Sequence, residues 1–197
     1  MTPDSPWGRF LGLLIIFGAA QLVYVPFVNP DMLSHRMELK KGTEVWDWVW
    51  LGAFVPAFMA IPAVAAFDAR SGLAPLPLLA VRTGFVFFFL GLGLFVRAMG
   101  ENPFFEKTVR IQRERDHHVI NTGPYRFVRH PGYVGMIIWI MAFPPLLGSS
   151  WAFIPAAITV VALVVRTALE DRTLHTKLAG YPEYAERVRF RLIPRLW

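Results

Sequence analysis

The feature that most constrains this chain is a run of 35 residues, from position 131 to position 165, without a single charged side chain. A straight α-helix of that length would measure about 50 Å, whereas the hydrocarbon core of a bilayer needs only about 30 Å. The run must therefore reverse direction. Pro144-Pro145 and Gly148-Ser149-Ser150 predict the break, because proline removes backbone donors and glycine permits a reversal. We expect a C-terminal helical hairpin whose polar flanks meet at one membrane surface.

The composition of the rest of the chain is also typical of a membrane protein. Of its 197 residues, 55% are apolar and 15% are aromatic. Three further charge-poor runs precede the hairpin, at residues 10–30, 48–67 and 76–96, the last interrupted only by Arg82. We predict an all-α polytopic membrane protein with five transmembrane helices, the two hairpin arms being short. Residues 1–197 form one integral-membrane domain, with three N-terminal spans in 1–96 and a loop, hairpin and tail in 97–197.

The first run resembles a secretory signal peptide in its position but differs from one in its flank. Asp4 stands there against a single Arg9, and the apolar stretch continues past Ala20. We therefore expect the first run to be retained as a span.

The formal net charge of +6 could indicate a nucleic-acid partner, but the basic residues follow the membrane topology. With five spans, 17 of the 20 Lys and Arg residues fall on one side. Only Arg9, Arg70 and Arg82 fall on the other. The positive-inside rule then places the amino terminus outside and the carboxyl terminus in the cytoplasm. We expect membrane lipids as partners and no nucleic acid.

Several familiar chemistries are excluded by what the sequence lacks. There is no cysteine, so disulfides, thiolate metal sites and a cysteine nucleophile are ruled out. His117 and His118 are adjacent and do not share a helix face, and neither an H-x-x-x-H pattern nor a nucleotide-binding glycine loop occurs. We expect no metal. Gly91 and Gly93 within the third span are interpreted as helix-packing positions.

The ionisable residues lie in the loop before the hairpin and in the tail after it. Arg129 and His130 precede Pro131, which suits the first turn of a helix; they could face a ligand or snorkel to lipid phosphates. Arg166 and Glu170 share a helix face and form either an ordinary ion pair or an ion-recognition site.

Two further sets of residues have ordinary membrane interpretations. In the tail, three arginines alternate with apolar residues, which suits an interfacial segment with basic groups towards phosphates. These arginines are Arg187, Arg189 and Arg191. Indole rings near the ends of the spans are interpreted as interfacial anchors. These are Trp7, Trp46, Trp48, Trp50 and Trp151.

Four ordered motifs in the second half of the chain carry a family resemblance. They are His117-His118-Val119-Ile120, the block 123–133 containing Arg129-His130-Pro131, the pair Glu170-Asp171, and the stretch 181–187 followed by Leu192-Ile193-Pro194. In this order they resemble the isoprenylcysteine carboxyl methyltransferase family and its bacterial relatives, which are similar in turn to membrane phospholipid methyltransferases. His118 is bulkier than the family residue, and Asp171 stands where a second Glu is common.

The resemblance implies that S-adenosylmethionine binds between the hairpin and the tail. By position, the residues lining the cofactor site would be Gln112, His117, His118, Val119, Ile120, Tyr125, His130, Pro131, Tyr133 and Glu170. Arg166 would face the acceptor, and His130 is the second candidate catalytic residue. The implied location is the bacterial inner membrane, with the site facing the cytoplasm.

The chemistry of the residues suits such a transfer. A carboxylate acceptor is already ionised at pH 7 and needs no general base, and the guanidinium fork of Arg166 could hold it. A thiol or amine acceptor would need a base, for which His130 and His117 are the candidates. The sequence leaves these acceptors open.

We predict an S-adenosylmethionine-dependent methyltransferase that acts at the membrane on a lipophilic small molecule or lipid, with a carboxylate favoured as the acceptor. Two alternative hypotheses about the function stay open. An NADPH-dependent membrane lipid reductase is one, because membrane sterol reductases resemble this family in their C-terminal halves. A non-catalytic membrane scaffold is the other. The sequence also leaves a homo-oligomer open.

Overall fold

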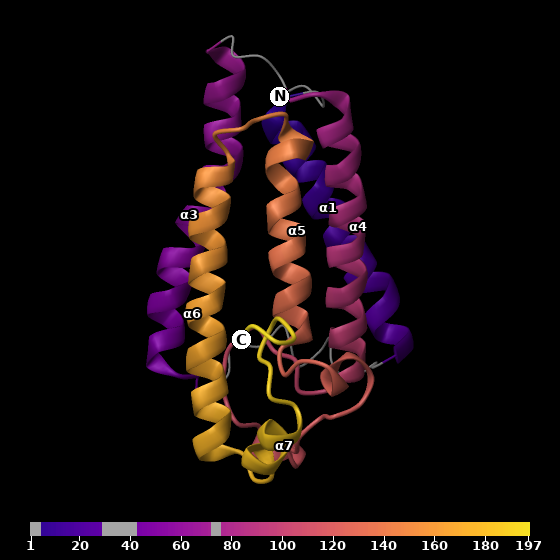
Figure 1. The fold of residues 1–197 in the computed structure, drawn as a ribbon, viewed down its shortest axis with the longest axis vertical. Helices are drawn as coiled ribbons and strands as arrows, with labels where there is room; N and C mark the ends of the chain where they lie inside the picture. The colour runs from indigo at the N-terminus through magenta and orange to yellow at the C-terminus, as the bar shows by residue number, and fades with distance from the viewer. Residues whose placement is uncertain (1–4, 29–42, 72–75) are drawn as a thin grey trace.

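The computed structural model describes residues 5–28, 43–71 and 76–197, and this part of the chain is helical, with no strand. Five long helices form a bundle: α1 (Pro6–Val28), α3 (Val45–Arg70), α4 (Leu78–Glu101), α5 (Pro131–Leu147) and α6 (Phe153–Lys177). Short helix α7 (Tyr181–Arg187) and the 3-10 turns η1 (Arg113–Arg115) and η2 (Gly123–Arg126) gather at one end of the bundle (Figure 1). Three of the basic residues used for the topology, Arg36, Lys40 and Lys41, lie outside the described residues.

The predicted all-α polytopic membrane fold is confirmed. Helices α1, α3, α4 and α6 are long and apolar enough to cross a membrane, and α5 is a shorter apolar helix of 17 residues, about 25 Å long. The expectation that both hairpin arms are short is wrong for α6, which has 25 residues. Its apolar part ends at Val165, but the helix continues through charged residues to Lys177.

The hairpin turn falls at Gly148, which adopts the left-handed conformation (φ 75°) that favours glycine. Pro144 and Pro145 lie inside the last turn of α5 and do not themselves break it. Their carbonyls accept the amides of Ser149 and Gly148, so the prolines take part in the cap. The Ser149 hydroxyl also donates to Asp68 on α3, 2.5 Å away, which ties the turn to the bundle.

Helices α4 and α5 are in close contact, which depends on two glycines. A Cβ atom built on Gly91 would lie 2.7 Å from the carbonyl oxygen of Gly135, and one built on Gly135 would lie 2.8 Å from that of Gly91. The two backbones therefore touch, as small residues permit in membrane helices. The packing role predicted for Gly93 is wrong, because a Cβ there would meet nothing within 4 Å.

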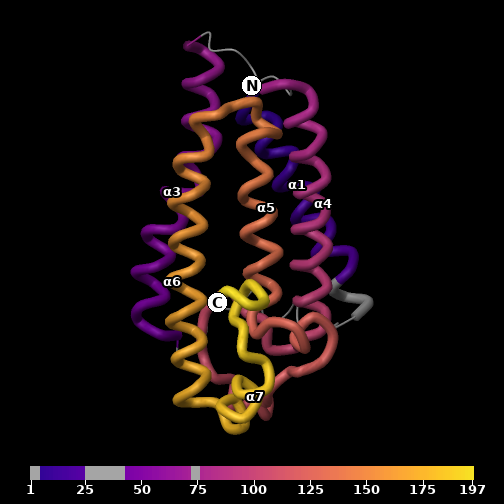
Figure 2. The backbone as a smooth tube through the Cα atoms, viewed as in Figure 1, coloured from indigo at the N-terminus to yellow at the C-terminus, as the bar shows by residue number. Residues whose placement is uncertain are grey.

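Helix α5 runs through the middle of the bundle, between α4 and α6 (Figure 2). Its Trp139 ring stacks on Phe17 of α1, with centroids 4.3 Å apart, and on Phe58 of α3, with centroids 5.6 Å apart. This aromatic cluster joins the N-terminal helices to the hairpin. It also forms the inner end of the cavity described next.

Candidate active site

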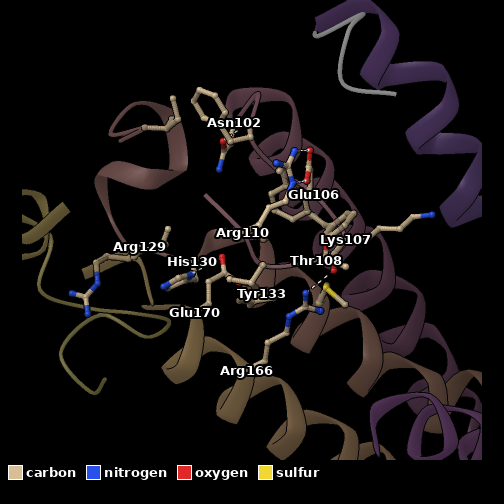
Figure 3. A pocket seen from close by; sticks show the side chains of 18 of the residues that line it. Asn102, Glu106, Lys107, Thr108, Arg110, Arg129, His130, Tyr133, Arg166 and Glu170 are labelled. Carbon is tan, nitrogen blue, oxygen red and sulfur yellow. Dashed lines mark hydrogen bonds and ion pairs between the residues drawn. The ribbon is translucent and has the colours of Figure 1, made fainter. Parts of the chain in front are cut away.

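A cavity of about 460 Å³ lies at the end of the bundle where the loop and the tail meet. Its outer part is lined by polar groups from the loop, α5 and α6, several of which converge in Figure 3. Its inner part is apolar and is lined by Phe54, Val55 and Phe58 of α3 with Met136 and Trp139 of α5. Since α3 begins at Val45 near the loop, these α3 residues lie progressively deeper along the helix. The cavity thus joins a polar mouth to an apolar interior.

Arg166 lies between these two parts. The residue is 7% exposed, and its Nη2 lies 3.1 Å from Asp47 Oδ1 and donates to the Lys107 carbonyl at 2.6 Å. The guanidinium also stands over the Trp50 ring, 4.1 Å from its centroid. The Nε atom is buried without a hydrogen-bond partner within the described part of the chain. Nη2 is therefore held by Asp47 and the loop, while Nε keeps an unused donor.

Trp50 is not the interfacial anchor that its position in the sequence suggested. Its side chain is buried and lines the cavity, and its Nε1 donates to the Ala162 carbonyl of α6 at 2.7 Å. The indole packs inward because α6 offers it an acceptor and a cation. Trp48 and Trp151 are exposed, as an anchor requires.

Arg166 and Glu170 do not form the ion pair that their four-residue spacing suggested, although both lie in the described stretch 76–197. Arg166 pairs with α3 instead. Glu170 accepts a hydrogen bond from the Tyr133 hydroxyl at 2.5 Å, and His130 Nδ1 lies 3.9 Å from its other oxygen. Figure 3 shows His130, Tyr133 and Glu170 converging beside Arg166. The cavity therefore carries a basic group and an acidic group that are not paired with each other.

Asp171 is the centre of the polar network behind this wall. It is 1% exposed and accepts hydrogen bonds from Arg129, Tyr181 and Arg191, and His130 Nε2 lies 3.2 Å from it. Arg129 and His130 are buried, so the hypothesis that they snorkel to lipid phosphates is wrong. Arg191 also turns inward rather than towards phosphates. The sequence places Asp171 in the acidic pair of the family pattern but predicts no contact for it.

The segment 117–120 forms one side of the mouth. The His117 ring stacks on Phe104 with centroids 4.3 Å apart, and its Nδ1 accepts the Gln112 amide at 3.3 Å. Burial, together with the neighbouring charges of His118 and Arg110, lowers the pKa of His117 to about 4. The ring is therefore neutral at pH 7. His118 is exposed at the rim.

Two buried tyrosines close the side of the cavity formed by η2 and α7. The Tyr184 hydroxyl donates to the Tyr125 carbonyl at 2.7 Å, and the Tyr125 hydroxyl donates to the Ala98 carbonyl at 3.3 Å. Burial raises the pKa of both phenols, so they remain protonated donors.

The structure brings together nine of the eleven residues predicted for the site. The residues that line the cavity are His117, His118, Val119, Ile120, Tyr125, His130, Tyr133, Arg166 and Glu170. Gln112 and Pro131 do not line it. The Gln112 side chain is buried and donates to the Phe104 carbonyl at 2.8 Å, so it holds the loop, and Pro131 occupies the first turn of α5.

The contribution of α1 and α3 to the cavity was missed from the sequence. Asp47, which holds Arg166, and the α3 residues of the inner part all lie far before α6 in the chain. The only sequence signal was a lone acidic residue among tryptophans, Trp46-Asp47-Trp48, at the start of a span.

Comparison with known proteins identifies a family to which part of the chain is similar. Residues 85–176 match the model of the isoprenylcysteine carboxyl methyltransferase (ICMT) family. This segment belongs to the isoprenylcysteine carboxyl methyltransferase family. The match includes the loop, the hairpin and the Glu170-Asp171 pair, and the family predicted from the ordered motifs is thereby confirmed.

Curated relatives carry methyltransferase names of the same family. The chain is 38% identical over 64 residues to the protein-S-isoprenylcysteine O-methyltransferase of Schizosaccharomyces pombe, which is 31% of this chain and 27% of the relative. It is 31% identical over 86 residues to protein-S-isoprenylcysteine O-methyltransferase B of Arabidopsis thaliana, which is 43% of this chain and 44% of the relative. The chain thus spans less than half the length of these family members, and α1 and α3 lie outside the family match.

Proposed function

We propose that this protein is an S-adenosylmethionine-dependent methyltransferase that esterifies the carboxylate of a lipophilic acceptor at the membrane surface. The observation that carries the proposal is the position of Arg166. A buried guanidinium, whose Nε has no hydrogen-bond partner among the described residues, stands where the polar mouth of the cavity meets its apolar interior. A lipid that carries a carboxylate has the same division into a charged end and an apolar chain.

The residues of the mouth fit the cofactor. The cavity volume is within the range of about 300–1,000 Å³ usual for small-molecule sites. The Glu170 carboxylate offers a counter-charge for a cationic ligand, and the rings of His117, Tyr133 and Tyr181 line the cavity around it. When bound there, S-adenosylmethionine supplies a methyl group attached to a positively charged sulfur. Glu170, Tyr133, His130 and the segment 117–120 are the residues that would hold it.

The residues of the inner part fit the acceptor. Arg166 would hold the carboxylate through its free donors and fix the direction of one oxygen. Trp50, Phe54 and Phe58 would surround the chain and exclude water. Orientation of the two reactants can supply several kcal/mol towards the barrier, and an ionised carboxylate needs no base. Since the relatives are named for S-isoprenylcysteine, an S-prenylated cysteine carboxylate is the acceptor to test first.

We infer that the site faces the cytoplasm, which for a bacterial chain means the inner leaflet of the inner membrane. The support is the charge distribution. Arg70 ends α3 and Arg82 lies near the start of α4, both at the end of the bundle opposite the cavity. The basic residues of the loop and tail cluster at the cavity end, as the positive-inside rule requires of cytoplasmic segments.

Methyl transfer tests the proposal directly. The purified protein in lipid nanodiscs is given methyl-labelled S-adenosylmethionine with an N-acetylated S-prenylcysteine, or with the methyl ester of the same compound. We expect the wild-type protein to transfer the labelled methyl group to the free acid but not to its methyl ester, and the product to be base-labile. The Arg166→Ala variant should transfer no label. Absence of transfer both to this compound and to the acidic lipids of a membrane extract would overturn the proposal.

A further inference from the structure

We propose that Asp47 is a positioning residue that holds Arg166 away from Glu170, so that the basic and acidic groups of the cavity stay separate. Asp47 lies in the first turn of α3, outside the stretch that matches the family. The reason why the two groups must stay separate rests on the proposed function. The position of Asp47 beside Arg166 does not, because it is given by the contacts alone.

The spacing on α6 makes the separation surprising. Residues four apart on a helix are neighbours, and oppositely charged pairs at this spacing attract each other. Arg166 nevertheless makes its ion pair with Asp47, 119 positions away in the chain. Glu170 is left to accept the Tyr133 hydroxyl and to face His130. Something must therefore outcompete the local pair, and Asp47 is the carboxylate in contact with Arg166.

Asp47 is itself firmly held. It is 3% exposed, and its Oδ2 accepts the Val109 amide at 2.9 Å. The Val109 carbonyl in turn accepts the Glu44 amide at 3.1 Å, so the loop is tied to the start of α3. Arg166 also donates to the Lys107 carbonyl of this loop. The Asp47 carboxylate and the Lys107 carbonyl thus both hold Nη2 of the guanidinium.

Loss of the Asp47 charge has a specific consequence. A buried guanidinium without a counter-ion is costly, and the nearest carboxylate on its own helix is Glu170, one turn along. Arg166 should then turn to Glu170. The two groups would neutralise each other, and the cavity would lose its basic group for the acceptor and its acidic group for the cofactor in one step.

Thermal unfolding of the full-length protein tests this re-pairing without reference to activity. Asp47→Asn keeps the size and the acceptor oxygen but removes the charge. We expect it to lower Tm modestly in the wild-type background, because Glu170 takes over as counter-ion. In a Glu170→Gln background the same change removes both of these carboxylates, so it should lower Tm by at least about 3 °C more. Additive effects of the two changes would overturn the proposal.

Activity gives the second measurement, with Asp68→Asn as the matched control. Asp68 is also buried on the same helix, but it accepts a hydrogen bond from Ser149 at the opposite end. We expect Asp47→Asn to reduce kcat/KM for the S-prenylcysteine about tenfold or more and to weaken S-adenosylhomocysteine binding, and Asp47→Glu to recover part of both. Asp68→Asn should leave both unchanged. Equal losses in the two Asn variants would mean that Asp47 is merely structural.

The two experiments separate the two hypotheses. A wild-type protein that transfers no methyl group contradicts the proposed function, while the unfolding coupling still supports or overturns the role of Asp47. An active wild type with additive unfolding contradicts the role of Asp47 alone.

Discussion

Arg129 and Asp171 form a two-pronged ion pair in the interior of the protein: Arg129 Nε lies 2.7 Å from Asp171 Oδ1, and Nη2 lies 3.0 Å from Oδ2. Arg129 stands just before α5, and Asp171 lies near the end of α6. The Arg129 Nη1 donates in addition to the carbonyls of Val188 and Arg189 in the tail. The pair thus fastens the two arms of the hairpin and the tail to one another, and so closes one wall of the cavity.

Asp171→Asn should destabilise the protein by about 3–5 kcal/mol, because it leaves the guanidinium of Arg129 buried without its counter-ion. Release of the tail should also abolish S-adenosylhomocysteine binding. Thermal unfolding and calorimetry measure the two effects. Asp116→Asn is the control, since Asp116 is exposed and asparagine tolerates its left-handed backbone. Equal behaviour of the two variants would contradict the role given to the Arg129–Asp171 pair.

Gly91→Ala should force α4 and α5 apart, because the new methyl group would lie 2.6 Å from a backbone nitrogen of α5. We expect a loss of about 1–3 kcal/mol of stability, as in other overpacked interiors. Gly93→Ala, two residues away, has open space around it and should be neutral or slightly stabilising. Unfolding of the two variants in the same detergent makes the comparison, and an unaffected Gly91→Ala protein would show that the helices can separate freely.

Arg166→Lys should reduce kcat/KM for a carboxylate acceptor about a hundredfold while leaving S-adenosylhomocysteine affinity nearly unchanged. Lysine keeps the charge but loses the fork, so it cannot bind Asp47 and a ligand through separate edges. Arg172→Lys is the matched control, because Arg172 is exposed on the same helix. A cofactor affinity that fell together with the rate would place Arg166 on the cofactor side of the cavity instead.

His117 should make folding stability depend on pH in a defined window. Its folded pKa of about 4 lies below the ordinary value of 6.5, so between these values the unfolded chain binds a proton that the folded chain does not. Stability should therefore fall as the pH drops from about 6.5 to about 4, with no further loss from this residue below that. Tm measured across the window should depend less on pH in His117→Gln than in the wild type. Identical slopes would contradict a buried neutral His117.

The sequence predicted the hairpin and most of the site because both depend on local patterns. A charge-free run too long for one helix requires a reversal, and Gly148 supplies it. The four motifs lie on the hairpin and its flanks, so the hairpin that brings the flanks together also brings Tyr133 and His130 to Glu170.

The parts that the sequence did not predict depend on distant contacts. Arg166 has an acceptable partner four residues away in the chain, and nothing in the sequence says that Asp47 replaces it. Trp50 has the position of an anchor, and only the folded bundle offers its indole an acceptor on α6. The direction in which the basic flank faces was likewise open, because both phosphates and Asp171 satisfy an arginine.

Calorimetry of the wild-type protein with S-adenosylhomocysteine and with NADPH shows in one measurement whether the polar mouth of the cavity binds S-adenosylmethionine. We expect S-adenosylhomocysteine to bind at one site per chain and Glu170→Ala to weaken this binding at least about tenfold. NADPH should not bind. Tight binding of NADPH with no binding of S-adenosylhomocysteine would rule out the proposed methyltransferase site and favour a membrane reductase.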